Sequence, residues 1–141
     1  MTKYVVDASV ATKWYFPEEH SHAAVLLLGD SYSLVAPELL LSELANTILK
    51  KLRRREAHLF GAMRPLVSTP LSVALKPVAT IASLELGLRF GISAYDAHYV
   101  ALALDEQCPV VTADRRLLAA VQPHLPEAIS WIGDLATDDA T

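Results

Sequence analysis

The sequence contains a single cysteine, Cys108, which excludes an intrachain disulfide and any zinc site built on several cysteines. No apolar run approaches the roughly 20 residues of a membrane-spanning helix. The amino terminus has no signal-peptide pattern, and no glycine-rich phosphate loop or Ser/His/Asp triad is recognisable. We therefore expect one domain at residues 1–136, a frayed tail at 137–141, no membrane association and a location in the reducing cytoplasm.

Positive charge is also scarce. The 141 residues include 12 Lys and Arg against 16 Asp and Glu, which gives a net charge of −4. A general nucleic-acid binder is usually basic, so any binding of nucleic acid has to depend on local patches and bound cations. Hydrophobic residues make up 52% of the chain, enough for a sizeable core.

Strand and helix patterns alternate along the chain. The expected strands are 4–6, 33–36, 70–73, 109–112 and 129–131, and the expected helices are 17–28, 38–55, 57–66, 78–90, 94–106 and 115–121. In helix 38–55 the predicted buried face is Leu41, Leu44, Ile48 and Leu52. This alternation favours an α/β layered domain with a mainly parallel sheet, in which ligands bind beyond the carboxyl ends of the strands.

Four acidic residues lie at strand ends or on helices. Asp7 ends the first strand, Asp114 follows strand 109–112, Glu43 is on helix 38–55, and Asp96 is in the first turn of the helix that Ser93 caps. Carboxylates are costly in apolar surroundings, and a cluster of them is stabilised by a hard cation such as Mg²⁺ or Mn²⁺. The alternative for each acid alone is a turn residue, a helix cap or a solvated helix position.

The four acids together predict metal-dependent phosphodiester chemistry. Two ions roughly 3.5–4 Å apart can clamp the attacking and leaving oxygens of a phosphoryl displacement. One ion would activate a water as nucleophile, and the other would stabilise charge on the leaving oxygen. Ser9 and Thr112 lie two residues from Asp7 and Asp114 and are expected to orient carboxylates or metal-bound waters.

Three segments together resemble the PIN domain family, in particular its VapC-type toxins: VVDASVATKWYFPEE, APELLLSELANTILKKLRR and ISAYDAHYVALALDEQCPVVTADRRL. The likeness runs from the amino terminus to about Leu118. The order of its pieces is specific: Asp, then Glu with Asn three residues later, then Asp after Tyr, then Thr-Ala-Asp.

This resemblance implies a three-layer α/β/α sandwich and a Mg²⁺- or Mn²⁺-dependent endoribonuclease. It implies that Asp7, Glu43, Asp96 and Asp114 form the metal site, with Ser9, Asn46 and Thr112 beside it. It also implies a homodimer and a cognate antitoxin protein that blocks the site. Asp134 is a weaker candidate for a fifth acid, the alternative being an ordinary acid near a helix N-terminus.

Basic residues provide candidate contacts to RNA phosphates: Lys50, Lys51, Arg53, Arg54, Arg55, Arg115 and Arg116. The alternatives are a solvated helix end with cations that match the helix dipole and, for Arg115 and Arg116, simple balance of the nearby acids.

Two other functions stay open on the sequence. A phosphatase of the haloacid-dehalogenase type would use Asp7 as a covalent nucleophile, but that pattern requires a second Asp two residues later, where this chain has Ser9. A non-catalytic PIN-like interaction protein would use the acids only to bind metal or a basic peptide.

Overall fold

The computed structural model describes residues 1–54 and 73–139, with side chains described up to Leu135. Five strands form a single sheet: β1 (Thr2–Val6), β2 (Tyr32–Pro37), β3 (Val73–Lys76), β4 (Val110–Thr112) and β5 (Ile129–Trp131). Their order is β3-β2-β1-β4-β5, and every neighbouring pair is parallel. The chain thus adds β2 and β3 on one side of β1, and then β4 and β5 on the other side of β1.

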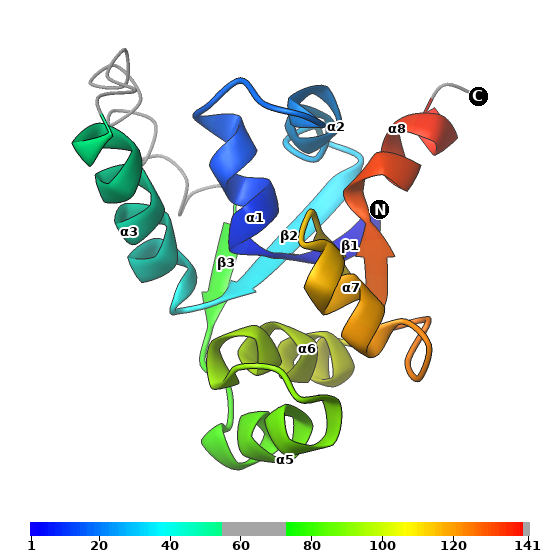
Figure 1. The fold of residues 1–141 in the computed structure, drawn as a ribbon. Helices are drawn as coiled ribbons and strands as arrows, with labels where there is room; N and C mark the ends of the chain where they lie inside the picture. Colours follow the sequence, from blue (N-terminus) through cyan, green and yellow to red (C-terminus); the bar gives the residue numbers. More distant parts are fainter. Residues whose placement is uncertain (55–72, 140–141) are drawn as a thin grey trace.

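Helices cover the sheet, as Figure 1 shows. They are α1 (Ala8–Ala11), the 3₁₀ turn η1 (Thr12–Trp14), α2 (Ser21–Leu26), α3 (Leu40–Arg53), α5 (Thr80–Phe90), α6 (Ala94–Glu106), α7 (Arg115–Val121) and α8 (Ile132–Asp139). Helix α6 packs on β1, β2 and β4, and α5 packs on α6. Helix α1 contacts β4, η1 and α3 on the other side of the sheet. The predicted α/β/α architecture with a parallel sheet is confirmed.

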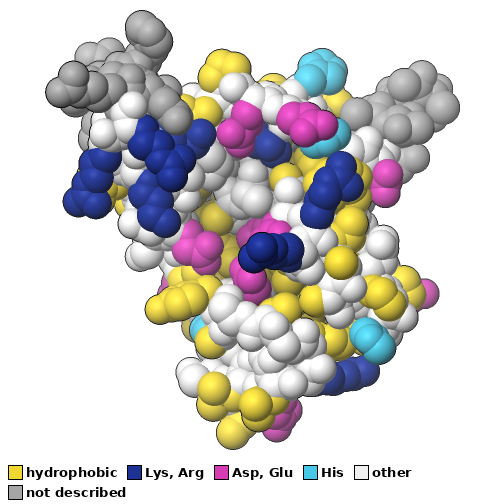
Figure 2. All heavy atoms as spheres, viewed as in Figure 1, with side chains coloured by type: hydrophobic (Ala, Val, Ile, Leu, Met, Phe, Trp, Pro, Cys, Tyr) yellow, Lys and Arg dark blue, Asp and Glu magenta, His cyan; other side chains and the backbone are white. Residues whose placement is uncertain are grey.

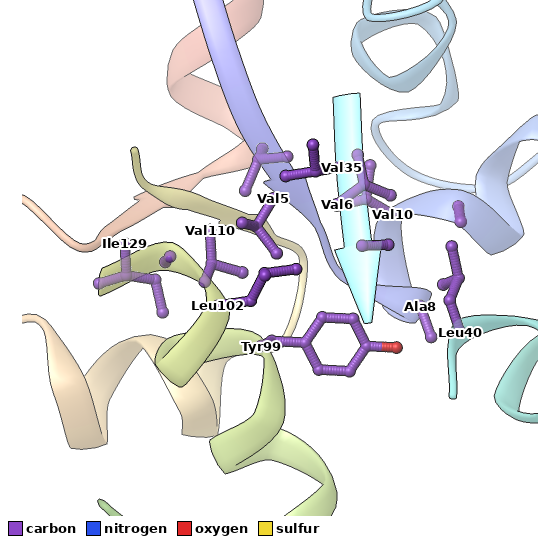
Figure 3. Packing of buried hydrophobic residues seen from close by; sticks show 14 of the residues in the cluster. Val5, Val6, Ala8, Val10, Val35, Leu40, Tyr99, Leu102, Val110 and Ile129 are labelled. Carbon is purple, nitrogen blue, oxygen red and sulfur yellow. The ribbon is translucent and has the colours of Figure 1, made fainter. Parts of the chain in front are cut away.

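The core lies on both faces of the central strands. Val5 and Val6 point to opposite faces of β1, and both are fully buried. Figure 3 shows Tyr99 and Leu102 of α6 below the sheet, and Ala8, Val10 and Leu40 beyond the end of β1. Burial on both faces explains why the central strands are continuous apolar runs.

The ends of α5 and α6 have the capping residues that the sequence indicates. Gly91 ends α5 at a left-handed φ of 66°, and its N–H donates to the Gly87 carbonyl at 2.9 Å. The Ser93 hydroxyl accepts the N–H of Asp96 at 3.1 Å, which starts α6. The predicted cap therefore also fixes where Asp96 lies, in the first turn of α6.

Local structure between β1 and β2 differs from the prediction. Helix α1 begins directly after Asp7, where no helix was expected, and the predicted helix 17–28 is reduced to α2. His20 has a left-handed φ of 66°, so a helix cannot pass through it. Four residues of α1 are too few for a helical period to stand out in a sequence.

Strand β3 covers Val73–Lys76 and so extends three residues beyond the predicted strand 70–73. Residues 70–72 of that prediction lie outside the described residues. Its pairing with Leu34–Pro37 of β2 sets this register. Lys76, at its end, forms an ion pair with Glu106 of α6 at 2.8 Å.

The buried stripe of α3 is Leu40, Leu44 and Ile48, at spacings of four residues. Leu41, expected on this face, is partly exposed, and Leu52 is half-buried against the small cluster of Phe16 and Ile48. The predicted helix 57–66 and Arg55 lie outside the described residues. Helix α8 reaches Asp139, through the first three residues of the tail that was expected to fray.

Two leucines of α3 provide a matched test of the packing. Leu44 is fully buried and Leu49 is 42% exposed. Leu44→Ala should lower the free energy of unfolding by about 2–5 kcal/mol, because it leaves a cavity in the core, whereas Leu49→Ala should change it by less than about 0.5 kcal/mol. Urea denaturation measures both values. Equal losses would contradict the described orientation of α3.

Candidate metal centre

Asp7 is the most constrained of the four acids. Its side chain is 4% exposed, at the junction of β1 and α1. Its Oδ2 accepts the hydroxyls of Ser9 at 2.7 Å and Thr112 at 2.8 Å. These are the two hydroxyls that the sequence placed beside the acids, and they fix the direction of the Asp7 carboxylate.

The same hydroxyls connect Asp7 to the end of β4. The Ser9 Oγ accepts the backbone N–H of Ala113 at 2.9 Å, and the Thr112 Oγ1 accepts that of Asp114 at 3.0 Å. Neighbouring β1 and β4 are the strands from which the sheet grows in opposite directions. Their carboxyl ends therefore form the position where ligands bind in open α/β sheets.

Asp114 has two roles at this position. Its Oδ1 accepts the N–H groups of Arg116 at 2.9 Å and Leu117 at 3.2 Å, so it caps α7. The side chain also lines the same pocket as Asp7. Asp114 is therefore a helix cap, as the alternative interpretation held, and it is also available to the pocket as a carboxylate.

All four acids line one pocket of about 420 Å³, with Asp7 from the end of β1, Glu43 from α3, Asp96 from α6 and Asp114 from the start of α7. Figure 2 shows acidic side chains gathered in the middle of this face, with Lys and Arg side chains to either side. Four separate elements thus bring together carboxylates that are up to 107 residues apart in the chain.

The carboxylates are held in an unfavourable environment. Burial raises the pKa of Asp7 to about 6, against the effect of its two hydroxyl partners, and Asp96 and Asp114 raise it further. Burial followed by the charge of Asp7 raises the pKa of Glu43 to about 7. Burial and then Asp114 also raise the pKa of Asp96. Each shift reflects missing compensation for negative charge.

The buried Glu43 carboxylate oxygen also lacks compensation for its negative charge. Glu43 Oε1 and the Tyr99 hydroxyl are both buried without a hydrogen-bond partner. The Tyr99 hydroxyl still acts on the Glu43 carboxyl, since it opposes the rise of the Glu43 pKa. Oxygen donors with uncompensated charge are the ligands that Mg²⁺ and Mn²⁺ prefer, so the donor set fits a hard divalent cation.

The geometry limits how such a cation is held. Within residues 1–54 and 73–135, no three His, Cys, Asp or Glu side chains are already arranged to ligate one ion. Mg²⁺ usually keeps several waters and takes one or two carboxylates directly. A cation in this pocket would be held directly by one or two of these carboxylates and would keep part of its water shell.

Three charged residues at this pocket form a group that the sequence did not single out as a unit. The Glu18 carboxylate forms ion pairs with Lys13 at 3.3 Å and with Lys51 at 3.6 Å, and all three residues line the pocket. Lys51 also lies over the Phe16 ring, 4.9 Å from its centroid. Lys13 was missed because it lies on η1, for which the sequence predicted no helix, and Glu18 because it lies in the loop before α2, where the predicted helix 17–28 was expected to begin.

On α3, the stripe that faces the acids is Glu43, Thr47 and Lys51. Asn46, which the resemblance placed beside the acids, and Lys50, a candidate contact to RNA phosphates, are exposed and do not line this pocket. Asn46 lines an adjacent pocket that shares Glu43. At 100° per residue, Thr47 and Lys51 lie about 40° and 80° to one side of Glu43 around α3, and Asn46 and Lys50 lie on its other side. The acidic pocket is on the Thr47 side.

The other candidates among the described residues do not line the acidic pocket. Arg53, Arg54, Arg115 and Arg116 are exposed, and Arg115 stacks on Trp131 at 4.4 Å. Asp134 is exposed in the first turn of α8 and does not line the pocket.

Comparison with known proteins identifies the family. The family model described as PIN domain matches residues 4–122. The chain belongs to the PIN domain family. This membership confirms the resemblance stated from the sequence, and it speaks against the haloacid-dehalogenase alternative.

Individual relatives of this PIN domain cover most of its length. It is 32% identical to Ribonuclease VapC3 of Pyrobaculum aerophilum over 120 residues, which are 82% of this chain and 92% of the relative. It is 34% identical to Ribonuclease VapC9 of Mycobacterium tuberculosis over 129 residues, 86% and 94% of the two chains. The crystal structure of PAE2754 from Pyrobaculum aerophilum superposes with a TM-score of 0.72 over 99% of this chain and 98% of that one. At 23% identity, that likeness concerns the fold.

The raised pKa values predict how the stability of this PIN domain depends on pH. A carboxyl whose pKa is higher in the folded than in the unfolded protein destabilises the fold as pH rises through the interval between the two values. In chelator, the free energy of unfolding should therefore fall between about pH 4 and pH 7, the window given by Asp7 and Glu43. Urea denaturation at several pH values, on the wild type and Glu43→Gln, measures this slope.

The Glu43→Gln variant should have a shallower slope and be more stable than the wild type at pH 8. The exposed Glu85 of α5 lies outside the pocket, so Glu85→Gln should keep the wild-type slope. A wild-type slope in Glu43→Gln as well would contradict the assigned environment of Glu43.

Cation binding should reverse this destabilisation. At 100 times its dissociation constant, Mn²⁺ or Mg²⁺ should raise the melting temperature by about 5–10 °C at pH 8, and by less at pH 5, where the carboxyls are protonated. Asp114→Asn should abolish the rise while keeping the α7 cap, because Asn caps helices as well as Asp. Asp134→Asn is the control and should retain it; its loss there would instead make Asp134 a ligand.

Proposed function

We propose that this PIN domain is a metal-dependent endoribonuclease, the toxin of a toxin–antitoxin pair. The observation that carries the proposal is the convergence of Asp7, Glu43, Asp96 and Asp114 on one pocket at the switch point of a parallel sheet. The relatives named VapC ribonucleases support RNA as the substrate. The pocket lies at the surface, where an RNA strand can reach it.

In this proposal the four carboxylates hold one or two Mg²⁺ or Mn²⁺ ions. A bound cation lowers the pKa of water and neutralises charge on the phosphate. Ser9 and Thr112 hold the Asp7 carboxylate in one orientation through two hydrogen bonds. Precise orientation matters because a displacement of about 1 Å at a catalytic group costs roughly 100-fold in rate.

Local positive charge allows an acidic chain to accept a polyanion. Lys13 and Lys51 line the acidic pocket, and the Glu18 carboxylate between them holds both ammonium groups there. We assign these two lysines to contacts with RNA phosphates next to the scissile bond. Arg53, Arg54, Arg115 and Arg116 are exposed around them and extend the positive region for a longer strand.

The proposed partners follow from the same function. A toxin nuclease requires an antitoxin that covers the acidic pocket, and we propose such a protein together with a homodimer of this chain. No helix among the described residues is long and apolar enough to cross a membrane. The reducing cytoplasm, where RNA is present, stays the predicted location.

Cleavage of a mixed cellular RNA pool tests the proposal. With Mg²⁺ or Mn²⁺, antitoxin-free protein should give discrete products by sequencing of the new RNA ends, and chelator should abolish them. Asp7→Asn should lower the rate by about 100-fold or more, because charge stabilisation by a metal is worth several kcal/mol. The exposed Asp105 of α6 provides the control, and Asp105→Asn should cleave like the wild type.

Circular dichroism and urea denaturation should show that Asp7→Asn is folded, so that its inactivity reports on chemistry. Cation binding by folded protein without cleavage of any RNA would overturn the nuclease and leave the non-catalytic interaction protein. Cleavage that persists in chelator would overturn the metal dependence.

A further inference from the structure

A second pocket adjoins the acidic one and has different chemistry. It has a volume of about 380 Å³ and is lined by Leu39, Ser42, Glu43, Asn46 and Tyr95. Glu43 lines both pockets, so the two are contiguous. Apart from Glu43, its lining consists of an aliphatic side chain, an aromatic ring, a hydroxyl and an amide, and none of these carries a charge.

Two helices each present neighbouring residues to the two pockets. On α3, Ser42 and Asn46 line the second pocket, whereas Glu43 and Thr47 line the acidic one. On α6, Tyr95 lines the second pocket and Asp96 the acidic one. Consecutive residues of a helix point about 100° apart. The boundary between the pockets therefore follows one residue step on both helices, which keeps the two sites side by side.

We propose that this second pocket is a subsite for one nucleobase of the RNA, next to the phosphate that the carboxylates address. This inference rests on the proposed nuclease function. Tyr95 is 68% exposed in the first turn of α6, so its ring is open for stacking. Asn46 and Ser42 supply donors and acceptors for a base edge, and Leu39 supplies an apolar wall. Single-stranded RNA is recognised by this combination of stacking and edge hydrogen bonds.

The charge distribution favours a base over a phosphate. The cations of this region, Lys13 and Lys51, line the acidic pocket and not the second one. The one charged side chain among the described residues that line the second pocket is the Glu43 carboxylate, which would repel a phosphate. Because Glu43 lines both pockets, a nucleotide whose phosphate lies at the acids can place its own base in the second pocket.

The subsite predicts that base identity at one position beside the cleaved bond controls the rate. Tyr95→Leu, which removes the aromatic ring, should lower kcat/KM roughly five- to 150-fold, the range for loss of one base stack. Tyr95→Phe should stay within about twofold, because it keeps the ring. Leu104→Ala is the control, since Leu104 is another exposed apolar residue of α6 outside both pockets.

A synthetic RNA oligonucleotide with a single abasic nucleotide, placed in turn on each side of the cleaved bond, gives the decisive measurement. At one position, loss of the base should slow the wild type about as much as Tyr95→Leu slows cleavage of intact RNA. The two changes together should cost little more than either alone, because both remove the same contact. Asn46→Ala should flatten the base preference at that position.

The outcomes separate the inference from the function on which it rests. Two results, each with an active wild type, would overturn the base subsite and leave the nuclease standing. One is a Tyr95→Leu variant that cleaves every RNA as fast as the wild type. The other is a Tyr95→Leu loss that adds fully to the loss from an abasic nucleotide at every position. If Tyr95→Leu instead weakened binding of a protein partner, the pocket would be a protein contact. Absence of RNA cleavage by the wild type would overturn the nuclease and the subsite together.

Discussion

The burial of one carboxylate governs this structure. Asp7 lies at the carboxyl end of the central strand, almost fully removed from water. Burial alone would favour its neutral form, and the hydroxyls of Ser9 and Thr112 partly offset this by donating to the same oxygen. Because Thr112 belongs to β4, this arrangement requires β4 to pair with β1. The order of the sheet and the orientation of Asp7 are thus parts of one arrangement.

The remaining acids add repulsion that the protein does not itself neutralise. Asp96 and Asp114 raise the pKa of Asp7, and Asp7 in turn raises that of Glu43. The lysines of the pocket are paired with Glu18. The uncompensated negative charge therefore destabilises the fold at this position. Such destabilisation is common at functional sites, where a ligand brings the compensating charge. A divalent cation would supply that charge, and under the proposed function it would allow a chain of net charge −4 to act on a polyanion.

Sequence patterns predicted much of the frame and of the candidate site. Alternating strands and helices indicated the parallel sheet, and Ser93 and Gly91 marked where α6 starts and α5 ends. The positions of Asp7 and Asp114 after strands placed them at one edge of the sheet. Glu43 and Asp96 were candidates as acids on helices, and the resemblance to PIN domains implied that all four form one metal site. The failures are local. Helix α1 is too short to show a helical period in the sequence. Helix α2 is shortened by the left-handed backbone of His20, and histidine is not a residue from which that conformation can be predicted.

The sequence by itself determined which residues are costly to bury, which segments are strands or helices, and where the helices are capped, since these depend on near neighbours in the chain. Only the tertiary structure decided which face of α3 meets the acids, so that Thr47 and Lys51 line their pocket while Asn46 lines the neighbouring pocket together with Tyr95. It also brought Lys13 and Glu18 to the same place. The physical reason is that a helix turns by 100° per residue, so packing that rotates it by one step exchanges the side chains that share a site.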